Sequence, residues 1–281
     1  MTYAGLMAEA EQKLADAGFS EARTDVRILM MYVCGMDVTA LLLDGNEPVP
    51  EEEKQRFEQA LEERLKHVPV QYITGEQGFC GLTFSVRPGV LIPRPETELL
   101  AETVFRMAEG KRVLDLCTGS GCIGITVAKL GKPSFVAASD YSEEALVIAK
   151  ENASRLCAGL TFYHGDLFEN VEGKYDIIVS NPPYIKSEVV DTLMPDVREY
   201  EPRVALDGRA DGLYFYRRIC KEAKAYLIPG GRLMFEIGFD QGDEVAKLLL
   251  AEGYSEIEVR KDYAGLDRMV FAVFPDGNKE K

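Results

Sequence analysis

The sequence lacks several features that mark particular classes of protein. No apolar run approaches the ~20 residues that a membrane-spanning helix needs, and the first residues show no basic segment followed by an apolar one. The six cysteines include no CxxC pair, and only two histidines are present to join them around a metal ion. We therefore predict a cytoplasmic protein with no membrane association, with free thiols and with no structural metal site.

Positive charge is scarce as well. The chain carries 32 lysines and arginines against 47 aspartates and glutamates, which gives a formal net charge of −15. Since binding to duplex DNA depends largely on clustered basic side chains, we expect no direct nucleic-acid partner. An acidic protein instead favours a cationic cofactor or a basic protein partner, because opposite charges attract over a long range.

The first part of the chain, residues 1–72, shows only helical patterns. Apolar residues recur at helical spacing in two segments that end at Gly18 and Gly35, and a short third helix is expected over residues 38–43. Pro50 opens a fourth segment with one apolar face, since proline is favoured in the first turn of a helix. These patterns predict a small helical bundle.

Beyond this bundle the pattern changes to residues that favour strands. Two short β-type runs, residues 71–75 and 82–86, flank a glycine-containing centre, which predicts a β-hairpin linker over residues 73–88. Strand-like and helix-like segments then alternate through residues 89–281, which predicts an α/β domain built on a parallel sheet.

Several further features belong to this α/β domain. Arg94 and Glu98, held close to two prolines, are candidates for the wall of a pocket. A segment rich in charge and proline, residues 186–210, is a candidate lid over a substrate. An antiparallel pair of strands within residues 257–274 is expected to close the sheet, and residues 276–281 are expected to form a frayed polar tail.

A glycine-rich turn follows the predicted buried strand at residues 112–116. Gly119, Gly121 and Gly124 fit the pattern G-x-G-x-x-G at the entry to a helix, where glycines let the backbone approach a ligand and exposed N–H groups suit an anion. The second strand ends at Asp140, where an acid is placed to take both hydroxyls of a ribose. A lone glycine motif is often a plain tight turn, but this order of elements favours a nucleoside-containing cofactor.

A tetrad of unusual composition follows another buried strand, residues 175–179. There Asn181 precedes Pro182, Pro183 and Tyr184 at the carboxyl end of the strand, which is where ligands bind in open α/β sheets. The prolines stiffen the backbone and leave carbonyls free, the asparagine adds an acceptor oxygen, and the tyrosine adds a flat ring. The tetrad therefore suits a planar group that carries an NH2, although such dipeptides also mark plain turns.

The glycine loop and its acid fit both a nicotinamide dinucleotide and S-adenosylmethionine. Two features favour the methyl donor. After a third short strand, Asp166 is placed to accept a hydrogen bond from an adenine amine and Phe168 to pack on the ring, with plain core packing of Phe168 as an equal alternative. The tetrad, in addition, has no obvious use in hydride transfer.

Taken together, these motifs resemble a known family. The cofactor loop, Asp140 and above all the tetrad resemble class I S-adenosylmethionine-dependent methyltransferases that modify planar NH2 groups. Residues 69–75, 90–98 and 262–268 narrow the resemblance to the bacterial PrmC/HemK family, and it covers essentially the whole chain.

The resemblance implies a fold and a reaction. The fold is the α/β class I methyltransferase fold, a Rossmann-like seven-stranded mixed sheet, in residues 89–281, with a helical substrate-recognition domain in residues 1–72. The reaction transfers a methyl group from S-adenosylmethionine to N5 of the glutamine in the Gly-Gly-Gln motif of class 1 peptide chain release factors. S-adenosylhomocysteine is the second product.

The resemblance also implies roles for individual residues. The implied cofactor-binding residues are Cys117, Thr118, Gly119, Ser120, Gly121, Asp140, Asp166, Phe168 and Asn181. The implied substrate-binding residues are Asn181, Pro182, Pro183 and Tyr184, of which Asn181, Pro182 and Tyr184 are catalytic. The Asn181 side-chain oxygen and the Pro182 carbonyl each accept one hydrogen of the glutamine NH2, and Tyr184 packs against the amide plane. Cys117 departs from the family's pattern, because many loops of this kind have a glycine there and a cysteine leaves the backbone less freedom.

Other interpretations stay open from the sequence. A nucleic-acid adenine N6-methyltransferase shares the tetrad, although the net charge counts against it. A nicotinamide-dependent oxidoreductase predicts binding of a reduced nicotinamide cofactor. A cofactor-sensing module predicts tight nucleoside binding without turnover.

Overall fold

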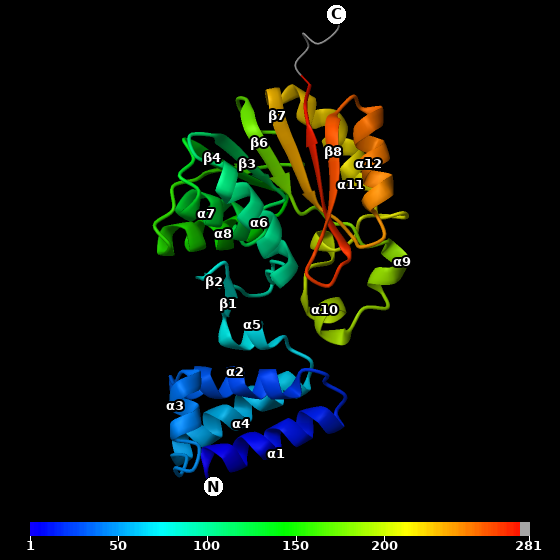
Figure 1. Cartoon of the computed structure of the whole chain (residues 1–281). Helices are drawn as coiled ribbons and strands as arrows, with labels where there is room; N and C mark the ends of the chain where they lie inside the picture. Colours follow the sequence, from blue (N-terminus) through cyan, green and yellow to red (C-terminus); the bar gives the residue numbers. More distant parts are fainter. Residues whose placement is uncertain (276–281) are drawn as a thin grey trace, which may run out of the picture. The chain divides into compact units, whose positions relative to one another are not determined.

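The computed structural model describes residues 1–275 (Figure 1). Residues 276–281, the expected polar tail, lie outside the described residues. The chain divides into two compact units. The helical unit comprises Met1–Gly75 and Pro195–Tyr200, and the sheet unit comprises Glu76–Met194 and the chain from Glu201 onward.

The helical unit is built around the apolar faces of amphipathic helices. Leu14, Leu29, Met30 and Phe57 are completely buried in its core. The short helix expected at residues 38–43 is present, and it is followed by the longer helix that Pro50 introduces. The helices are α1 (Tyr3–Asp16), α2 (Ala22–Cys34), α3 (Val38–Leu43), α4 (Glu51–Leu65), α5 (Val70–Thr74) and, from much later in the chain, α10 (Pro195–Tyr200).

A buried ion pair holds the later helix in this unit. The Arg64 side chain donates from Nε to Asp25 Oδ2 at 2.7 Å, and its Nη2 lies 3.4 Å from Asp196 Oδ2. The Tyr200 hydroxyl also donates to the Lys66 carbonyl at 2.8 Å. The segment that we predicted as a lid therefore contributes part of its length to the packing of the helical unit.

The predicted hairpin is present, but its first strand was placed wrongly. Residues 71–75 do not form a strand, because Val70 is buried in the helical core and its segment forms α5, which ends at Gly75 with φ +76°. Tertiary packing outweighs the β propensity of this short run. Strands β1 (Glu76–Phe79) and β2 (Leu82–Ser85) pair instead, across a two-residue turn at Cys80 and Gly81. Both turn residues have positive φ, as a type I′ turn requires.

The sheet unit contains the predicted seven-stranded mixed sheet. Its strand order is β5-β4-β3-β6-β7-β9-β8, in which β9 runs antiparallel to both neighbours and the other pairs are parallel. The antiparallel closing pair expected near the end of the chain is therefore confirmed. The strands are β3 (Arg112–Leu116), β4 (Phe135–Asp140), β5 (Thr161–His164), β6 (Tyr175–Ser180), β7 (Leu227–Glu236), β8 (Ser255–Lys261) and β9 (Asp267–Val273).

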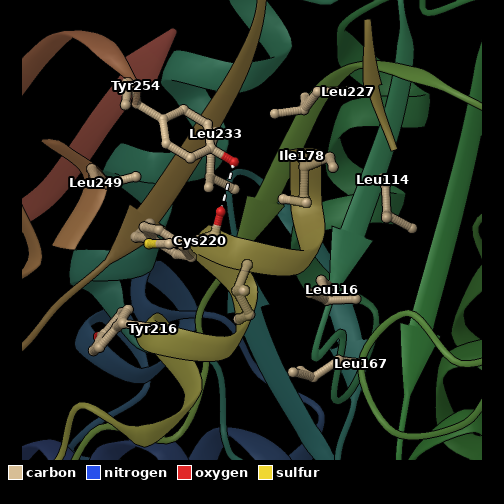
Figure 2. Close-up of a cluster of buried hydrophobic side chains, with 14 of the residues drawn as sticks. Leu114, Leu116, Leu167, Ile178, Tyr216, Cys220, Leu227, Leu233, Leu249 and Tyr254 are labelled. Atoms are coloured by element: carbon tan, nitrogen blue, oxygen red, sulfur yellow. Dashed lines mark hydrogen bonds between the residues drawn. The ribbon is translucent and has the colours of Figure 1, made fainter. Parts of the chain in front are cut away.

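Helices cover both faces of this sheet, and successive strand residues alternate between the two cores. In β6, Ile178 packs on the face shared with the later helices, while Ile177 and Val179 pack on the opposite face. Figure 2 shows the first of these cores, where the Tyr254 hydroxyl donates to the Cys220 carbonyl at 3.0 Å. Strands buried on both faces explain the nearly continuous apolar runs in the sequence.

The remaining elements connect and cover the strands. These elements are α6 (Pro95–Met107), α7 (Cys122–Leu130), α8 (Glu143–Arg155), α9 (Ser187–Val190), η1 (Arg203–Ala205), α11 (Tyr214–Glu222), η2 (Ala223–Ala225) and α12 (Gly242–Ala251). Within residues 1–275, none of the helices is long and apolar enough to cross a membrane.

Candidate active site

A cavity of about 290 Å³ lies at the carboxyl ends of β3, β4 and β6. The strand order reverses here, since β4 and β5 extend the sheet on one side of β3 and β6 extends it on the other. Open α/β sheets bind ligands at such a reversal, because the loops after the strands diverge and leave a crevice. The cavity brings together the glycine loop, Asp140 and Asn181, which are far apart in the sequence.

The glycine loop has a backbone conformation that favours glycine. Gly119 and Gly121 adopt φ values of +56° and +83°, and a Cβ at Gly121 would lie 2.7 Å from Ile125 Cδ1. Cys117 also adopts a left-handed φ of +61° although it carries a side chain. This conformation costs a non-glycine residue about 1–3 kcal/mol, so the loop stores strain at a residue that lines the cavity.

A buried acid under the loop holds it in place. Asp115 Oδ2 accepts hydrogen bonds from the Thr118 hydroxyl at 2.6 Å and from the Gly124 N–H at 2.8 Å. Its Oδ1 has no hydrogen-bond partner among residues 1–275. Burial raises the pKa of Asp115 to about 7, against the two hydrogen bonds, which lower it. The loop is therefore anchored by a carboxyl that is poorly solvated in its charged form.

Asp140 joins the loop to the end of β4. Its Oδ2 accepts from the Gly119 N–H at 2.8 Å, and its Oδ1 accepts from the Ser142 N–H at 2.9 Å. Burial raises the pKa of Asp140, and these backbone hydrogen bonds oppose the rise. Each carboxylate oxygen can accept a second hydrogen bond, so Asp140 both shapes the loop and presents acceptors to the cavity.

Of the two residues predicted to contact the adenine, Asp166 lines the cavity and Phe168 does not. The Asp166 carboxylate is already paired with Arg218, whose Nη1 lies 2.9 and 2.8 Å from the two oxygens. Phe168 is 2% exposed and stacks on Tyr226 with ring centroids 4.7 Å apart, so core packing, the alternative considered for it, is what the structure shows. Leu167, with φ +56°, lines the cavity in its place.

The asparagine of the tetrad faces the same cavity as the glycine loop. Asn181 donates from Nδ2 to the Thr97 hydroxyl at 3.4 Å, and among residues 1–275 no hydrogen bond reaches its Oδ1. The preceding residue, Ser180, donates its hydroxyl to the Leu116 carbonyl at 2.7 Å and so ties the end of β6 to the end of β3. The carboxamide oxygen is therefore held in the cavity as an available acceptor.

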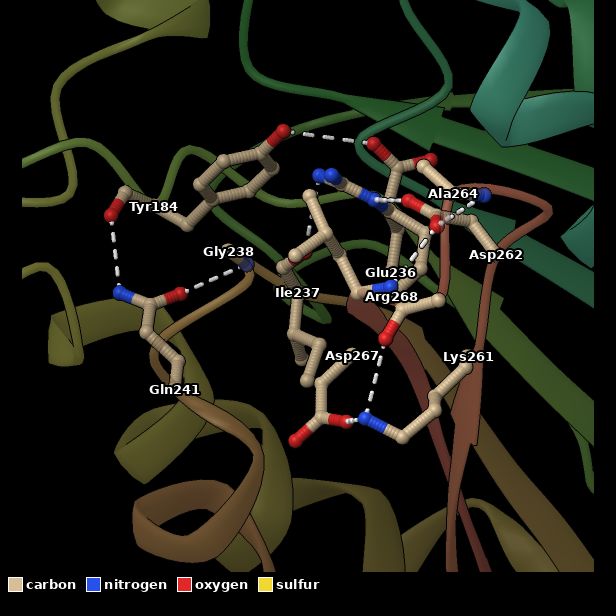
Figure 3. A network of polar contacts seen from close by, with 12 residues as sticks. Tyr184, Glu236, Ile237, Gly238, Gln241, Lys261, Asp262, Ala264, Asp267 and Arg268 are labelled. Atoms are coloured by element: carbon tan, nitrogen blue, oxygen red, sulfur yellow. Dashed lines mark hydrogen bonds and ion pairs between the residues drawn. The ribbon is translucent and has the colours of Figure 1, made fainter.

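The rest of the tetrad is packed more deeply than predicted. Pro183 lines the cavity, whereas Pro182 and the Tyr184 side chain do not. Figure 3 shows the Tyr184 hydroxyl directed at Glu236 Oε1, 3.4 Å away, and the Tyr184 carbonyl accepting from Gln241 Nε2 at 3.0 Å. A Cβ at Gly212, which has φ +74°, would lie 2.4 Å from that carbonyl oxygen. The backbone of the tetrad is thus enclosed on several sides.

Glu236, at the end of β7, is a second buried acid that the sequence reasoning did not single out. It is 2% exposed, and its Oε2 has no hydrogen-bond partner among residues 1–275. Burial raises the pKa of Glu236 to about 7, while Thr97, Arg268 and Tyr184 lower it and Glu96 adds to the rise. The sequence could have identified Glu236 as a candidate site residue, because Glu236 ends a buried strand in the same way as Asp140.

Of the two residues predicted for the pocket wall, Arg94 lines the cavity and Glu98 does not. Arg94 forms an ion pair with Glu201, whose Oε2 accepts from the Ile92 N–H at 3.0 Å. Glu98 instead accepts from the Cys80 N–H at 2.9 Å, at the turn of the hairpin. Several residues of the predicted lid line the cavity as well: Pro202, Val204, Ala205 and Arg209.

The donor set fits a nucleoside-containing cofactor. Glycines without side chains give access to backbone N–H groups, Asp140 supplies acceptors for hydroxyl groups, and Val90, Leu91 and Leu167 supply apolar walls. No group of three or more His, Cys, Asp or Glu side chains suited to a metal ion occurs within residues 1–275.

Solved structures share this fold. A methyltransferase from Pyrococcus furiosus matches with a TM-score of 0.55 at 20% sequence identity, over 70% of this chain and 91% of its own. The T. thermophilus 16S rRNA N2 G1207 methyltransferase, solved in complex with AdoMet and guanosine, matches with a TM-score of 0.51 at 19% identity, over 70% of this chain and 49% of its own. Together with the seven-stranded sheet, these likenesses show the Rossmann-like fold of class I methyltransferases.

Sequence comparison gives the family within this class. The family profile of the PrmC N-terminal domain matches residues 5–75, and that of the methyltransferase small domain matches residues 94–196. The release factor glutamine methyltransferase of Clostridium acetobutylicum is 43% identical over 257 residues, which are 89% of this chain and 90% of the relative. That of Geobacter sulfurreducens is 41% identical over 259 residues, 92% of this chain and 91% of the relative. The chain belongs to the release factor glutamine methyltransferase family.

Proposed function

We propose that the protein methylates N5 of the glutamine in the Gly-Gly-Gln motif of class 1 peptide chain release factors, with S-adenosylmethionine as the donor, in the cytoplasm. The observation that carries this proposal is the position of Asn181. Its carboxamide oxygen is an available acceptor in the cavity that also contains the glycine loop and Asp140. The names of the relatives support the choice of substrate.

The cofactor half of the cavity would be formed by the loop from Cys117 to Gly121 and by Asp140. Asp140 offers its remaining lone pairs to hydroxyl groups, while the loop brings backbone close to the ligand. When bound, S-adenosylmethionine supplies a methyl group on a sulfonium and leaves as S-adenosylhomocysteine. Asp166, already paired with Arg218, and the buried Phe168 are weaker candidates for direct contact.

The substrate half of the cavity positions a weak nucleophile. An amide nitrogen is unreactive because its lone pair is delocalised into the carbonyl. The Asn181 oxygen would accept one N–H of the substrate amide and the carbonyl of Pro182, which does not line the cavity itself, would accept the other, and the two would orient the nitrogen lone pair. Orientation of this kind can lower a barrier by up to ~7–11 kcal/mol. The substrate nitrogen gains the methyl group and afterwards loses one proton. Pro183 forms part of the cavity wall, and the Tyr184 hydroxyl donates to Glu236.

A direct experiment tests the proposed function. The protein is incubated with methyl-labelled donor and a class 1 release factor, and the label is located by mass spectrometry. Label on the glutamine of the Gly-Gly-Gln motif supports the proposal. Label on adenine of added duplex DNA, with none on the factor, would favour the nucleic-acid methyltransferase that shares the tetrad. Binding of a reduced nicotinamide cofactor, visible by fluorescence, would favour the oxidoreductase.

We further propose that the helical unit, predicted as residues 1–72, recognises the protein substrate. It contributes no residue to the cavity, yet α3 exposes Leu42 and Leu43, which are 79% and 78% exposed. Exposed large apolar side chains favour contact with a protein. Replacing both by serine should raise KM for the release factor with kcat unchanged, because the cavity is intact. An unchanged KM would argue against recognition through α3.

A further inference from the structure

Thr97 occupies an unusual place for a residue in the first turn of a helix. It lies in α6, is 2% exposed and still borders the cavity. Its hydroxyl does not cap the helix, since the N-cap residue is Arg94 and no side-chain capping bond is made there. Instead, the hydroxyl oxygen accepts from Asn181 Nδ2 at 3.4 Å. Two residues 84 positions apart thus meet at the candidate substrate site.

The direction of this hydrogen bond depends on a third group. A hydroxyl has one hydrogen to donate and two lone pairs to accept with, so by itself it can face either end of an asparagine amide. The Thr97 hydroxyl also interacts with the buried carboxyl of Glu236. An ionised carboxylate only accepts hydrogen bonds, so the ionised form of Glu236 favours the arrangement in which the Thr97 hydroxyl accepts from Asn181. The structure has this arrangement, since the NH2 end of the Asn181 amide faces Thr97.

The groups around Glu236 influence its ionisation in opposite directions. The Tyr184 hydroxyl donates to its Oε1 from the loop after β6, and the Arg268 side chain approaches from β9 (Figure 3). Arg268 is in turn paired with Asp262 at 3.2 Å, while the charge of Glu96, in α6, disfavours ionisation of Glu236. Burial is the largest influence and raises the pKa of Glu236 to about 7, while two hydroxyl groups and one guanidinium oppose that rise and keep the ionised form accessible near neutral pH.

We propose that Thr97 is a positioning residue for methyl transfer, which turns the Asn181 nitrogen away from the substrate and leaves the Asn181 oxygen as the acceptor for the substrate NH2. This inference rests on the proposed function, because it concerns how the same site orients an amide. An asparagine with the opposite orientation would present two N–H donors to the NH2 of the substrate, and donors repel donors. The orientation of one amide group thus decides whether the cavity can bind a planar NH2 in a reactive pose.

The test compares variants of Thr97 in the full-length protein. Thr97→Val removes the hydroxyl and keeps the shape, and Thr97→Ala is a second deletion in case the valine disturbs folding. Thr97→Ser keeps the hydroxyl. The matched control is Thr103→Val in the same helix, whose hydroxyl donates to the Leu99 carbonyl at 2.8 Å and takes no part in the site. Single-turnover methylation of release factor is measured with saturating donor, together with donor affinity by calorimetry.

We expect Thr97→Val to slow methyl transfer on the order of tenfold, the usual effect of one lost hydrogen bond, with donor affinity unchanged. Thr97→Ser and Thr103→Val should retain the parental rate. In an Asn181→Ala background, Thr97→Val should cause no further loss, because the amide that it orients is gone. A purely structural role for Thr97 would not produce this dependence on Asn181.

Three results would overturn the inference: a parental rate in both Thr97→Val and Thr97→Ala, a serine variant as slow as the valine variant, or the same further loss in the Asn181→Ala background. Failure of the proposed function would be visible separately. In that case the parental protein would bind the donor but place no label on the release factor.

Discussion

The buried Asp25 of the helical unit and two buried acids of the sheet unit, Asp115 and Glu236, differ in how they are paired. In the helical unit, the buried Asp25 meets Arg64 at 2.7 Å, and the guanidinium also lies 4.2 Å from the centroid of the Phe19 ring. In the sheet unit, the buried Asp115 and Glu236 each keep one oxygen without a partner among residues 1–275. A paired buried charge supports the fold, whereas an incompletely paired one costs stability and is a mark of functional sites.

Two strained backbone positions of the sheet unit lie at the cavity. Cys117 and Leu167 adopt left-handed φ values of +61° and +56°, and both line the cavity. Strain of this kind persists only where the surrounding structure enforces it. The sheet unit therefore gives up part of its stability at the cavity, next to the residues that we assign to catalysis.

The largest expected effect comes from breaking the paired acid of the helical unit. Arg64→Ala should lower the free energy of unfolding by about 3–5 kcal/mol, because it leaves Asp25 buried without its partner. The control is Lys54→Ala in the same helix, whose exposed pair with Glu58 spans 3.8 Å and should contribute no more than about 1 kcal/mol. Urea denaturation measures both. Equal losses in the two variants would contradict the distinction between buried and exposed pairs.

Changes at Asn181 should affect chemistry and leave stability largely unaltered. Asn181→Ala should reduce turnover about 10²–10³-fold, the usual effect of losing one preorganised contact at a reacting centre, with a much smaller change in donor affinity. Asn181→Asp keeps an acceptor oxygen but adds a charge that is costly to desolvate, so its rate should lie between those of the alanine variant and the parent. Single-turnover rates with saturating donor separate chemistry from binding. If the rate of the chemical step in the alanine variant equalled that of the parent, the tetrad would be a plain turn with no role in catalysis.

The buried Glu236 of the sheet unit should make the stability of the protein depend on pH. Burial raises the pKa of Glu236 from 4.5 to about 7, so the folded state holds its proton more tightly than the unfolded state. The stability that this proton confers is complete below about pH 4.5 and is lost as pH rises through 7. Glu236→Gln removes this loss, so the stability of the variant relative to the parent should increase between pH 5 and pH 8, by up to about 3 kcal/mol.

Thermal or urea unfolding of the two proteins at both pH values measures this difference. Asp115, also a buried acid, is present in both proteins and cancels. A stability difference that does not change with pH would mean that Glu236 has the same pKa in the folded and unfolded states.

The smallest expected effect concerns the strained cysteine. Cys117→Gly should leave stability within about 1 kcal/mol of the parent, because relief of the left-handed strain is offset by the greater freedom of glycine in the unfolded chain. Cys117→Val should be about 1–2 kcal/mol less stable than the glycine variant, since a β-branched side chain tolerates this backbone poorly. Denaturation curves provide the comparison. A valine variant as stable as the glycine variant would show that the loop relaxes.

Much of the sheet unit was predictable because its signals are local. Apolar runs such as residues 175–179 predicted buried strands, and Gly119 and Gly121 predicted a glycine loop at the entry to a helix. The error over residues 71–75 also has a local cause. A run of five residues with mixed propensity takes the structure that packing favours, and here Val70 draws the segment into the helical core.

The candidate site was predictable only in part. Asp140 and Asn181 were placed correctly at the cavity because a polar residue after a buried strand must lie at the carboxyl edge of the sheet. Phe168 was ambiguous, since an aromatic residue after a strand can face a ligand or the core, and the stack on Tyr226 decides for the core. Residues assigned by resemblance to bind cofactor and substrate stay predictions until variants are measured.

The sequence by itself determined the kinds of elements, the glycine loop and the tetrad, because spacing and backbone preference act over a few neighbouring residues. Only the tertiary structure decided which side chains meet. Thr97 and Asn181 come together because the start of α6 and the loop after β6 both border the cavity, and Glu236 at the end of β7 influences them. Such contacts depend on strand order and register, which no short stretch of sequence contains.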